Sequence, residues 1–145
     1  TVKPKLEAYL DGSKSLVAYI KKHKPKIVHN VDTVLSTVAF GRAHRDFEKY
    51  YFAKLFGNHP FLVAATSTGG DLAQLTGKRN PYPNKLGVIE PDAYADILIV
   101  DGNPLEDLSV LGANPEWFDA SPRERGHSTI RIIMKDGKIY KNTLN

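Results

Sequence analysis

The sequence predicts an α/β chain in which helices precede a small group of antiparallel strands. Apolar residues recur at helical spacing in several segments before residue 78. By contrast, residues 95–100 form a short run rich in Ile and Val, which is typical of a strand. Asp136 and Gly137 stand between two further β-type runs, and this dipeptide is a strong hairpin signal. The expected order is therefore helix, strand, helix, helix and then three strands.

One helix and one strand are predicted in the first third of the chain. The helix covers about residues 13–24, with Ser13 or Ser15 as its N-cap and Pro25 ending it. Residues 26–31 follow directly, and their β-branched character predicts a strand that runs into a loop. A lone strand beside one helix cannot form a closed sheet, and its unpaired edges are unstable. We therefore expect the chain to be a piece of a larger fold.

Two helices are predicted next. The first covers residues 43–57 and carries an apolar stripe on one face, with Gly57 ending it. The members of this stripe are Phe47, Tyr50, Tyr51, Leu55 and Phe56. The second helix covers residues 59–77, although Gly69 and Gly70 inside it each disfavour a helix by about 1 kcal/mol. Tight packing at these two glycines would explain their presence.

The second half of the sequence alternates loops with short extended elements. After the strand rich in Ile and Val, the Asn-Pro at 103–104 predicts a turn followed by one short helical turn. The hairpin covers about residues 130–141. Residues 112–128 form a long loop, which we expect to be ordered around Trp117 and Phe118.

The composition is that of an ordinary globular domain. The chain has 145 residues, 41% of them hydrophobic and 25% charged, which is a one-domain length. No apolar run approaches the roughly 20 residues of a membrane helix, so we expect no membrane partner. The absence of cysteine excludes disulfides and thiolate metal sites. Because the chain starts at Thr1 rather than Met, we expect its original N-terminus to have been removed.

The net charge of +4 is concentrated in the first part of the chain. Residues 1–60 carry 11 Lys or Arg against 5 acidic residues, whereas residues 61–145 carry 9 against 11. The density is greatest from Lys21 to Lys26, where the first predicted helix ends. Basic residues stabilise the C-terminal end of a helix, so a solvated helix end is the first explanation. An anionic partner is the second, although the absence of interleaved aromatic residues disfavours nucleic acid.

Two stretches in the second half resemble the C-terminal end of metal-dependent amidohydrolases. The first, LGVIEPDAYADILIVDGNPLED, covers residues 86–107, and the second, IMKDGKIYKN, covers residues 133–142. Residues 64–66, Ala-Ala-Thr, with the later Leu-Thr-Gly at 75–77, resemble the helix that precedes the first stretch. The similarity extends over about residues 13–145 and is greatest to the imidazolonepropionase-like and Xaa-Pro-dipeptidase-like members.

The resemblance implies a (β/α)₈ barrel flanked by a small β-sandwich. The expected fold is then α/β, a C-terminal fragment of the barrel plus the C-terminal strands of the sandwich. Residues 1–80 would supply the last β/α units of the barrel, and residues 81–145 the C-terminal part of the sandwich domain. Gly87 and the turn at Pro91-Asp92 would lead the chain into the sandwich. Family members usually have Gly where this chain has Asp92, and Asp tolerates positive φ better than most residues.

The resemblance also implies a divalent metal site, usually zinc, in the mouth of the barrel. Asp32 stands where family members have an Asp that binds metal and takes the proton from the attacking water. The preceding residues, Asn30 and Val31, depart from the usual Gly-Thr. The other family ligands, a His-x-His pair, a Lys or Glu and two further His, fall outside this chain. Alternatively, Asp32 caps a loop or the following helix.

The chain contains five histidines. His44, between Arg42 and Arg45 in what would be the loop after the eighth barrel strand, is a substrate-binding candidate. Its alternative role is in a solvated helix start. His29 and Asp32 are three residues apart, so on a strand they would point to opposite faces. The remaining histidines, expected on the surface, are His23, His59 and His127.

Three functions therefore stay open. The first is the C-terminal part of a metal-dependent amidohydrolase that hydrolyses amide or related C–N bonds of a small-molecule or peptide substrate. This chain would be inactive without the rest of the barrel, and zinc would bind only in the completed site. The second is a non-catalytic module that self-associates or binds a companion chain through its open sheet edges. The third is an anion or nucleic-acid binder that uses Lys21 to Lys26.

Overall fold

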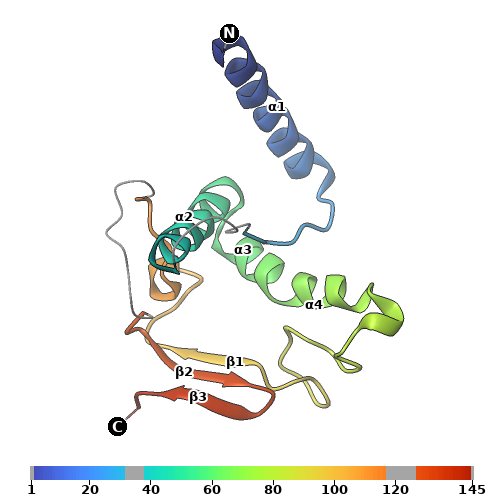
Figure 1. Ribbon diagram of the computed structural model, residues 1–145, viewed down its shortest axis with the longest axis vertical. Coiled ribbons are helices and arrows are strands. Elements are labelled where there is room, and N and C mark those ends of the chain that lie inside the picture. The colour runs from blue at the N-terminus through green and yellow to red at the C-terminus, as the bar shows by residue number, and fades with distance from the viewer. Residues whose placement is uncertain (1, 32–37, 117–126, 145) are drawn as a thin grey trace.

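The computed structural model describes residues 2–31, 38–116 and 127–144 of the chain. Figure 1 shows a group of helices lying over a small sheet, with the first helix projecting away from both. The elements are α1 (Val2–His23), α2 (Val38–Phe56), α3 (Asn58–Ala65), α4 (Ser67–Gln74), the 3₁₀ turn η1 (Gly77–Arg79), β1 (Ile97–Val100), the 3₁₀ turn η2 (Leu108–Leu111), β2 (Ile130–Lys135) and β3 (Lys138–Asn142).

The first helix, α1, is longer than predicted because it starts at Val2 rather than near Ser13. The serine proposed as its N-cap is therefore an interior helical residue. Pro4 lies in the first turn, where a proline costs no helical hydrogen bond, so it does not prevent the longer helix. The predicted end of the helix is confirmed. Lys24 adopts a φ of 48° and donates its backbone N–H to the Ile20 carbonyl at 2.8 Å, which caps the last turn.

The predicted strand at residues 26–31 is wrong, because this segment is irregular in the structure. Its backbone is joined to the helices where the His29 N–H donates to the Ala64 carbonyl at 3.2 Å. A strand requires a neighbour that supplies partners for its backbone groups. No other strand in the described part of the chain pairs with this segment. Residues 26–31, although β-branched in part, therefore form no hydrogen-bonded ladder with a described strand.

The second helix, α2, confirms the predicted helix at 43–57, although it starts earlier. Gly57 follows its last residue with a φ of 103°, a conformation that glycine adopts without strain. Aromatic rings then hold α2 against α3. The ring of Phe52 lies 5.9 Å from that of Phe61 and 5.0 Å from that of Phe56. This aromatic contact brings the two helices together immediately after the turn.

The single helix predicted at 59–77 is instead two short helices that break at Thr66, where φ is −120° and ψ is −92°. The break lies against a later loop. A Cβ added at Gly87 would lie 2.3 Å from the Thr66 carbonyl oxygen, and one at Gly70 would lie 2.1 Å from that of Leu86. Two backbones therefore approach at positions where only glycine fits. This close approach is the packing reason for a glycine inside α4.

The three strands form an antiparallel sheet in the order β1-β2-β3, with Leu98 of β1 opposite Ile133 of β2. The predicted hairpin is confirmed. Asp136 and Gly137 have φ values of 50° and 73°, the pair of positive values that a tight two-residue turn requires. The Gly137 N–H donates to the Ala95 carbonyl at 3.1 Å. The hairpin turn is therefore fastened to the start of β1.

The loop before β1 follows the prediction made for its turn. Gly87 has a φ of 72° and Asp92 a φ of 65°, so Asp92 does adopt the positive φ that glycine usually supplies. Further along, the predicted short helical turn is η2. The Asp107 side chain accepts a hydrogen bond from the Ser109 backbone N–H at 2.9 Å and caps this turn. Hydrogen bonds from the Ser109 backbone and hydroxyl lower the pKa of Asp107.

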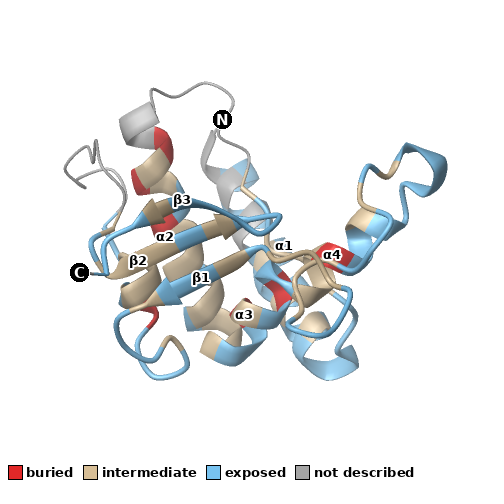
Figure 2. Ribbon diagram, turned by 90° about the horizontal axis from the view of Figure 1, so that it is seen from below, coloured by how far each residue is buried: buried red, intermediate tan, exposed pale blue. Residues whose placement is uncertain are grey.

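Few of the described side chains are buried, and those lie in the helical half and beside it. They are Ala43, Asp46, Phe61, Ala64 and Leu108. Figure 2 shows that the strands are intermediate or exposed along most of their length. Leu98 and Ile133, which face each other across the sheet, are 53% and 37% exposed. Both side chains are therefore partly open to solvent.

The structure thus confirms a mixed architecture of helices and a small antiparallel sheet. The division into barrel residues 1–80 and sandwich residues 81–145 stays a prediction. The expected order around Trp117 and Phe118 falls outside the described residues. None of the described helices is both long and apolar enough to cross a membrane.

Candidate functional site

The segment leading to Asp32 carries a histidine that packs among aromatic rings. The imidazole of His29 lies edge-on to the ring of Phe61 at 4.9 Å and to that of Phe52 at 5.7 Å, measured between ring centroids. Phe52 belongs to α2 and Phe61 to α3. His29 therefore joins the segment to both helices, and the aromatic contacts account for its position.

Burial changes the acid–base behaviour of His29. Desolvation is the largest cause and lowers the pKa of this imidazole. The positive charge of Lys49 lowers it further, whereas the carboxylate of Glu48 acts in the opposite direction. A lowered pKa favours the neutral imidazole near pH 7. Packed in this way, His29 has a structural role rather than that of a charged group.

Asp32 itself lies outside the described residues, so its roles as metal ligand and catalytic carboxylate stay predictions. Just before it, the Val31 backbone N–H donates to the Asn30 side-chain oxygen at 2.8 Å. This contact lies where the predicted strand was expected to run into a loop.

His44, the predicted substrate-binding residue, lies within α2 rather than in a loop. Its Nε2 atom lies 3.1 Å from Oε1 of Glu48, one helical turn further on. The two side chains are 26% and 36% exposed, so the pair is partly accessible. Because Glu48 also acts on the pKa of His29, the structure brings both imidazoles near one carboxylate. Sequence analysis had not singled out Glu48.

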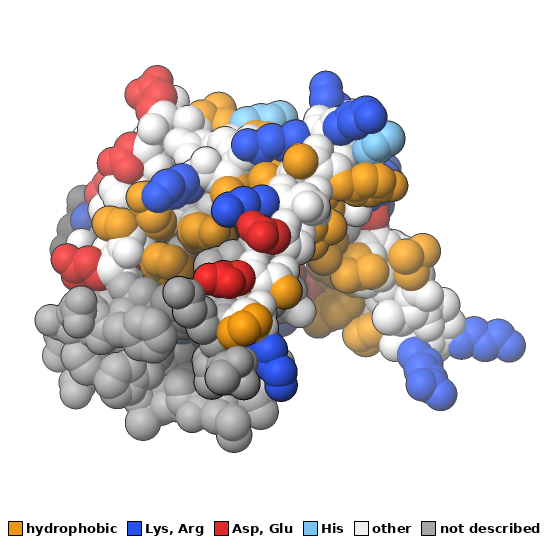
Figure 3. Space-filling view, turned by 90° about the horizontal axis from the view of Figure 1, so that it is seen from above, with side chains coloured by type: hydrophobic (Ala, Val, Ile, Leu, Met, Phe, Trp, Pro, Cys, Tyr) orange, Lys and Arg blue, Asp and Glu red, His pale blue; other side chains and the backbone are white. Residues whose placement is uncertain are grey.

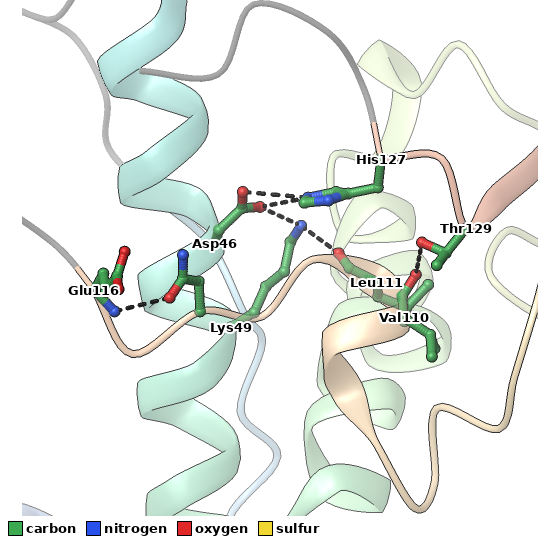
Figure 4. Close-up of polar contacts among 8 residues, drawn as sticks. Asp46, Lys49, Val110, Leu111, Glu116, His127 and Thr129 are labelled. Atoms are coloured by element: carbon green, nitrogen blue, oxygen red, sulfur yellow. Dashed lines mark hydrogen bonds and ion pairs between the residues drawn. The ribbon is translucent and has the colours of Figure 1, made fainter. Parts of the chain in front are cut away.

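A buried carboxylate, Asp46, joins α2 to two loops of the second half (Figure 4). The Lys49 ammonium lies 3.0 Å from Oδ1 of Asp46, and Nε2 of His127 lies 3.2 Å from Oδ2. Lys49 also donates to the Leu111 carbonyl at 2.8 Å. In addition, the Asp46 carbonyl accepts from the Asn114 N–H at 3.1 Å. These contacts connect α2 to the end of η2, to the loop that follows it and to the segment that precedes β2.

The prediction that His127 lies on the surface holds only in part. Its side chain is only 21% exposed, and its ring packs against Gly112. A Cβ added at Gly112 would lie 1.7 Å from Nε2 of His127, and Gly112 also has a φ of 85°. The Lys141 ammonium donates to the His127 carbonyl at 2.9 Å. A glycine is therefore required for the imidazole to reach Asp46.

The contacts of Asp46 with Lys49 and His127 form a junction between the two halves of the chain. The position of Asp46 in this junction could have been recognised from the sequence. Asp46 stands three residues after Ala43 and four before Tyr50, so helical spacing places it on the same face as both. A carboxylate on a largely apolar face must find a partner when it is buried. His127, by contrast, lies 81 positions from Asp46, and local patterns say nothing about so distant a pair.

The described residues alone do not fit a metal ion. Within residues 2–31, 38–116 and 127–144, no three His, Asp or Glu side chains form a group that could hold one. The imidazole of His29 is packed against aromatic rings, and His44 is paired with Glu48. Any metal site that includes Asp32 would need ligands from beyond these residues.

The comparisons with known proteins concern the fold. No protein-family model matches the chain, and no curated protein matches it. The chain is similar to the crystal structure of a prolidase complexed with N-methylphosphonate-L-proline, with a TM-score of 0.64 and 23% identity. It is also similar to the crystal structure of an amidohydrolase, with a TM-score of 0.65 and 25% identity.

The fold is that of the C-terminal portion of an amidohydrolase. The likeness covers 89% of the chain for the prolidase and 90% for the amidohydrolase, so it extends over helices and sheet together. In each case this amidohydrolase-like chain spans only 26% of the solved structure. The activity of a whole amidohydrolase is therefore a matter for proposal.

Proposed function

We propose that the chain is the C-terminal part of a metal-dependent amidohydrolase that hydrolyses amide or related C–N bonds. In this proposal, residues 1–80 supply the last β/α units of a barrel. Residues 81–145 supply the C-terminal strands of a flanking sandwich. The observation that carries the proposal is the likeness of almost the whole chain to an amidohydrolase and a prolidase structure. The chain is inactive until the rest of the barrel is present.

The irregular segment at 26–31 supports this proposal. Its Ile27, Val28 and Val31 are β-branched residues typical of a barrel strand, yet the segment lacks a neighbouring strand in the described chain. In a closed barrel each strand pairs on both sides, which would supply the missing partners. His29 and its aromatic neighbours would then belong to the layer between strand and helices, because they join this segment to α2 and α3.

Asp32 follows this segment, where catalytic residues of such barrels collect. We assign to it the two roles that the family resemblance implies, metal ligand and acceptor of the proton of the attacking water. A divalent metal, zinc in this proposal, would polarise the substrate and supply charge stabilisation. The remaining ligands would come from the missing part of the barrel. His44 and Glu48, partly exposed on α2, would contact the substrate or its surroundings.

The proposal is tested by native mass spectrometry of material purified from the natural source, followed by a denatured spectrum and metal analysis. A larger companion polypeptide with bound zinc, together with cleavage of dipeptides, is the expected result. A metal-free sample of this chain alone, with no cleavage, would contradict the proposal. The companion could equally be the preceding part of a longer chain, which the denatured mass would reveal.

Asp32→Asn provides the sharper test in the completed enzyme. Loss of the carboxylate should lower turnover by about 10²–10⁴-fold, because an amide cannot accept the proton. The far-ultraviolet circular dichroism should stay that of the wild type. Asp11→Asn is the matched control, since the Asp11 side chain is 77% exposed on α1. Equal turnover of the Asp32→Asn variant and the control would remove Asp32 from the catalytic machinery.

A second candidate function is a non-catalytic module that self-associates. It is favoured by the exposed apolar side chains on the sheet, including Leu98 and Ile133. The outer strands β1 and β3 also each have an edge that lacks a partner within the described chain. This candidate predicts a metal-free homo-oligomer, so the same mass spectrum separates it from the hydrolase.

A further inference from the structure

A groove lies where α1 ends, on the side of the molecule from which that helix projects. It has a volume of about 600 Å³ and is bounded by the last turn of α1, the segment that follows it, the end of α2, α3 and the start of α4. Its apolar wall includes Ile20, Ile27, Phe56 and Val63. This is the size and lining of a site that takes up apolar side chains. We call it the lysine groove, because Lys21, Lys24 and Lys26 also line it.

Three lysines line the same groove, namely Lys21, Lys24 and Lys26. Lys26 pairs with Asp71 at 2.8 Å. Neither of the other two forms an ion pair within the part of the chain that the structure describes. Figure 3, which views this side from above, shows hydrophobic side chains lying beside Lys and Arg side chains. The groove therefore combines an apolar wall with unneutralised positive charge.

The apolar surface extends beyond the groove along α1. Leu16 and Tyr19 are 59% and 57% exposed, and they precede Ile20 at the spacing of one helical stripe. Figure 1 shows that α1 projects away from the other described helices, so none of them lies alongside this stripe. The combined surface is elongated, which suits an extended occupant better than a compact small molecule.

We propose that the lysine groove binds an acidic amphipathic helix of a partner protein. Such a helix would place its apolar residues against Ile20, Phe56 and Val63. Its carboxylates would lie near Lys21 and Lys24, which gives charge complementarity at the edge of the groove. This inference develops the basic run that sequence analysis left with two explanations. It does not depend on the proposed hydrolase activity.

Other occupants fit less well. The α1 helix of a second copy carries five Lys against two acidic residues, so it would add positive charge to a basic groove. An anionic membrane matches the charge but not the shape, because a bilayer cannot enter a groove walled by α1 and α3. Single-stranded nucleic acid is usually bound by several aromatic side chains on which successive bases stack, whereas Phe56 is the one aromatic residue among those that line the groove.

The test uses the full chain and a fluorescent model helix of Leu and Glu, about 18 residues long so that it can stay helical. Its binding is followed by anisotropy, with a matched helix of Leu and Lys as the peptide control. The acidic helix should bind, and its affinity should fall as salt is added. The basic helix should not bind. Vesicles of phosphatidylserine and phosphatidylcholine are tested in parallel.

Variants locate the site. Lys21→Glu/Lys24→Glu should weaken binding of the acidic helix about tenfold, since two ion pairs at the edge are replaced by repulsion. Lys78→Glu/Arg79→Glu makes the same change of charge on η1, outside the groove, and should bind like the wild type. Val63→Asp should also weaken binding, because it places a charge on the apolar wall. Val63 is 38% exposed, so the fold tolerates this change.

Three results would overturn the inference. Equal binding of the acidic and basic helices would mean a non-selective apolar surface. Binding to vesicles without binding to the acidic helix would assign the surface to membranes. An unchanged affinity of Lys21→Glu/Lys24→Glu would place the binding elsewhere on the chain. Circular dichroism of each variant confirms that an effect on binding is not an effect on folding.

Discussion

Among single residues, the buried Asp46 joins α2 to the second half of the chain. The Lys49 ammonium and the His127 imidazole both lie within 3.3 Å of its carboxyl group. Gly112 leaves the space in which His127 lies. A buried charge is tolerated only when its partners are in place. Folding of the first and second halves is therefore coupled at one carboxylate.

The first prediction concerns this carboxylate. Asp46→Ala should lower the free energy of unfolding by about 3–5 kcal/mol, because it leaves the partners of a buried ion pair uncompensated. Asp11→Ala should change it by about 0–1 kcal/mol, since the Asp11–Lys14 pair at 3.4 Å is exposed. Urea unfolding followed by circular dichroism measures both. Similar midpoints for the two variants would show that the junction contributes little.

The second prediction concerns pH. Burial lowers the pKa of His29 below its usual 6.5, so the unfolded chain takes up a proton at a higher pH than the folded chain. The free energy of unfolding should therefore fall as the pH drops below about 6.5 and through the lower pKa of the folded state. His29→Phe keeps an aromatic ring and removes the titrating group.

Urea unfolding at a series of pH values checks this effect. Between about pH 7 and pH 5, the stability of His29→Phe should decline less steeply than that of the wild type. His29→Phe leaves the other side chains of the chain unchanged, so the comparison isolates His29. Parallel curves would mean that His29 is as easily protonated in the folded chain as in the unfolded one.

At the scale of elements, two turns formed as the sequence predicted, whereas one longer helix and one strand did not. The hairpin turn and the turn at Asp92 both have the predicted positive φ, because local sterics decide such conformations. The helix predicted at 59–77 is broken at Thr66, where the loop at Gly87 approaches it. The strand predicted at 26–31 pairs with no other strand among residues 2–31, 38–116 and 127–144. In both cases the outcome depended on a distant segment.

The third prediction concerns the hairpin. Gly137 has a φ of 73°, which a β-branched residue adopts only with strain. Gly137→Val should therefore lower the free energy of unfolding by about 1–3 kcal/mol. Lys138→Val introduces the same side chain one residue later, at an exposed strand position, and should be nearly neutral. Thermal unfolding distinguishes them, and equal midpoints would remove the special role of Gly137.

On the scale of the whole molecule, the chain exposes more surface than its size explains. Its accessible area is 10723 Å² for a mass of 16.1 kDa. A compact monomer of this mass would expose about 7,400 Å². Permanent interfaces bury roughly 2,000–5,000 Å² in total, which is about 1,000–2,500 Å² on each partner, so the excess on this one chain is larger than a single such interface would cover. The exposed sheet and the projecting α1 are therefore surfaces on which association would bury apolar side chains.

The fourth prediction follows from this excess. Native mass spectrometry and sedimentation should find the chain in species heavier than 16.1 kDa, with either a companion chain or further copies. Leu98→Lys/Ile133→Lys places two charges on one face of the sheet and should shift the distribution toward the free chain. A monomeric wild type would contradict the prediction. Unchanged association of the double variant would place the interface away from this face.

Local features of the fold could be predicted from the sequence, whereas the candidate site could be predicted only in part. The aromatic stripe located α2, and the Asp-Gly pair located the hairpin, since both depend on neighbours within a few residues. The placement of His44 within α2 beside Glu48 differed from the expected loop. Asp32 was singled out by family resemblance, and its geometry lies outside the described residues.

By itself, the sequence determined the elements whose stability is local and the resemblance to amidohydrolases that the fold comparison supports. Only the tertiary structure decided that His127 reaches Asp46 across 81 positions and that the helix breaks at Thr66 beside a loop. It also decided that the segment at 26–31 pairs with no strand in the part of the chain that the structure describes. The physical reason is that burial and pairing depend on which distant segments meet. Local helix and strand propensities carry no information about contacts between segments that are distant in the sequence.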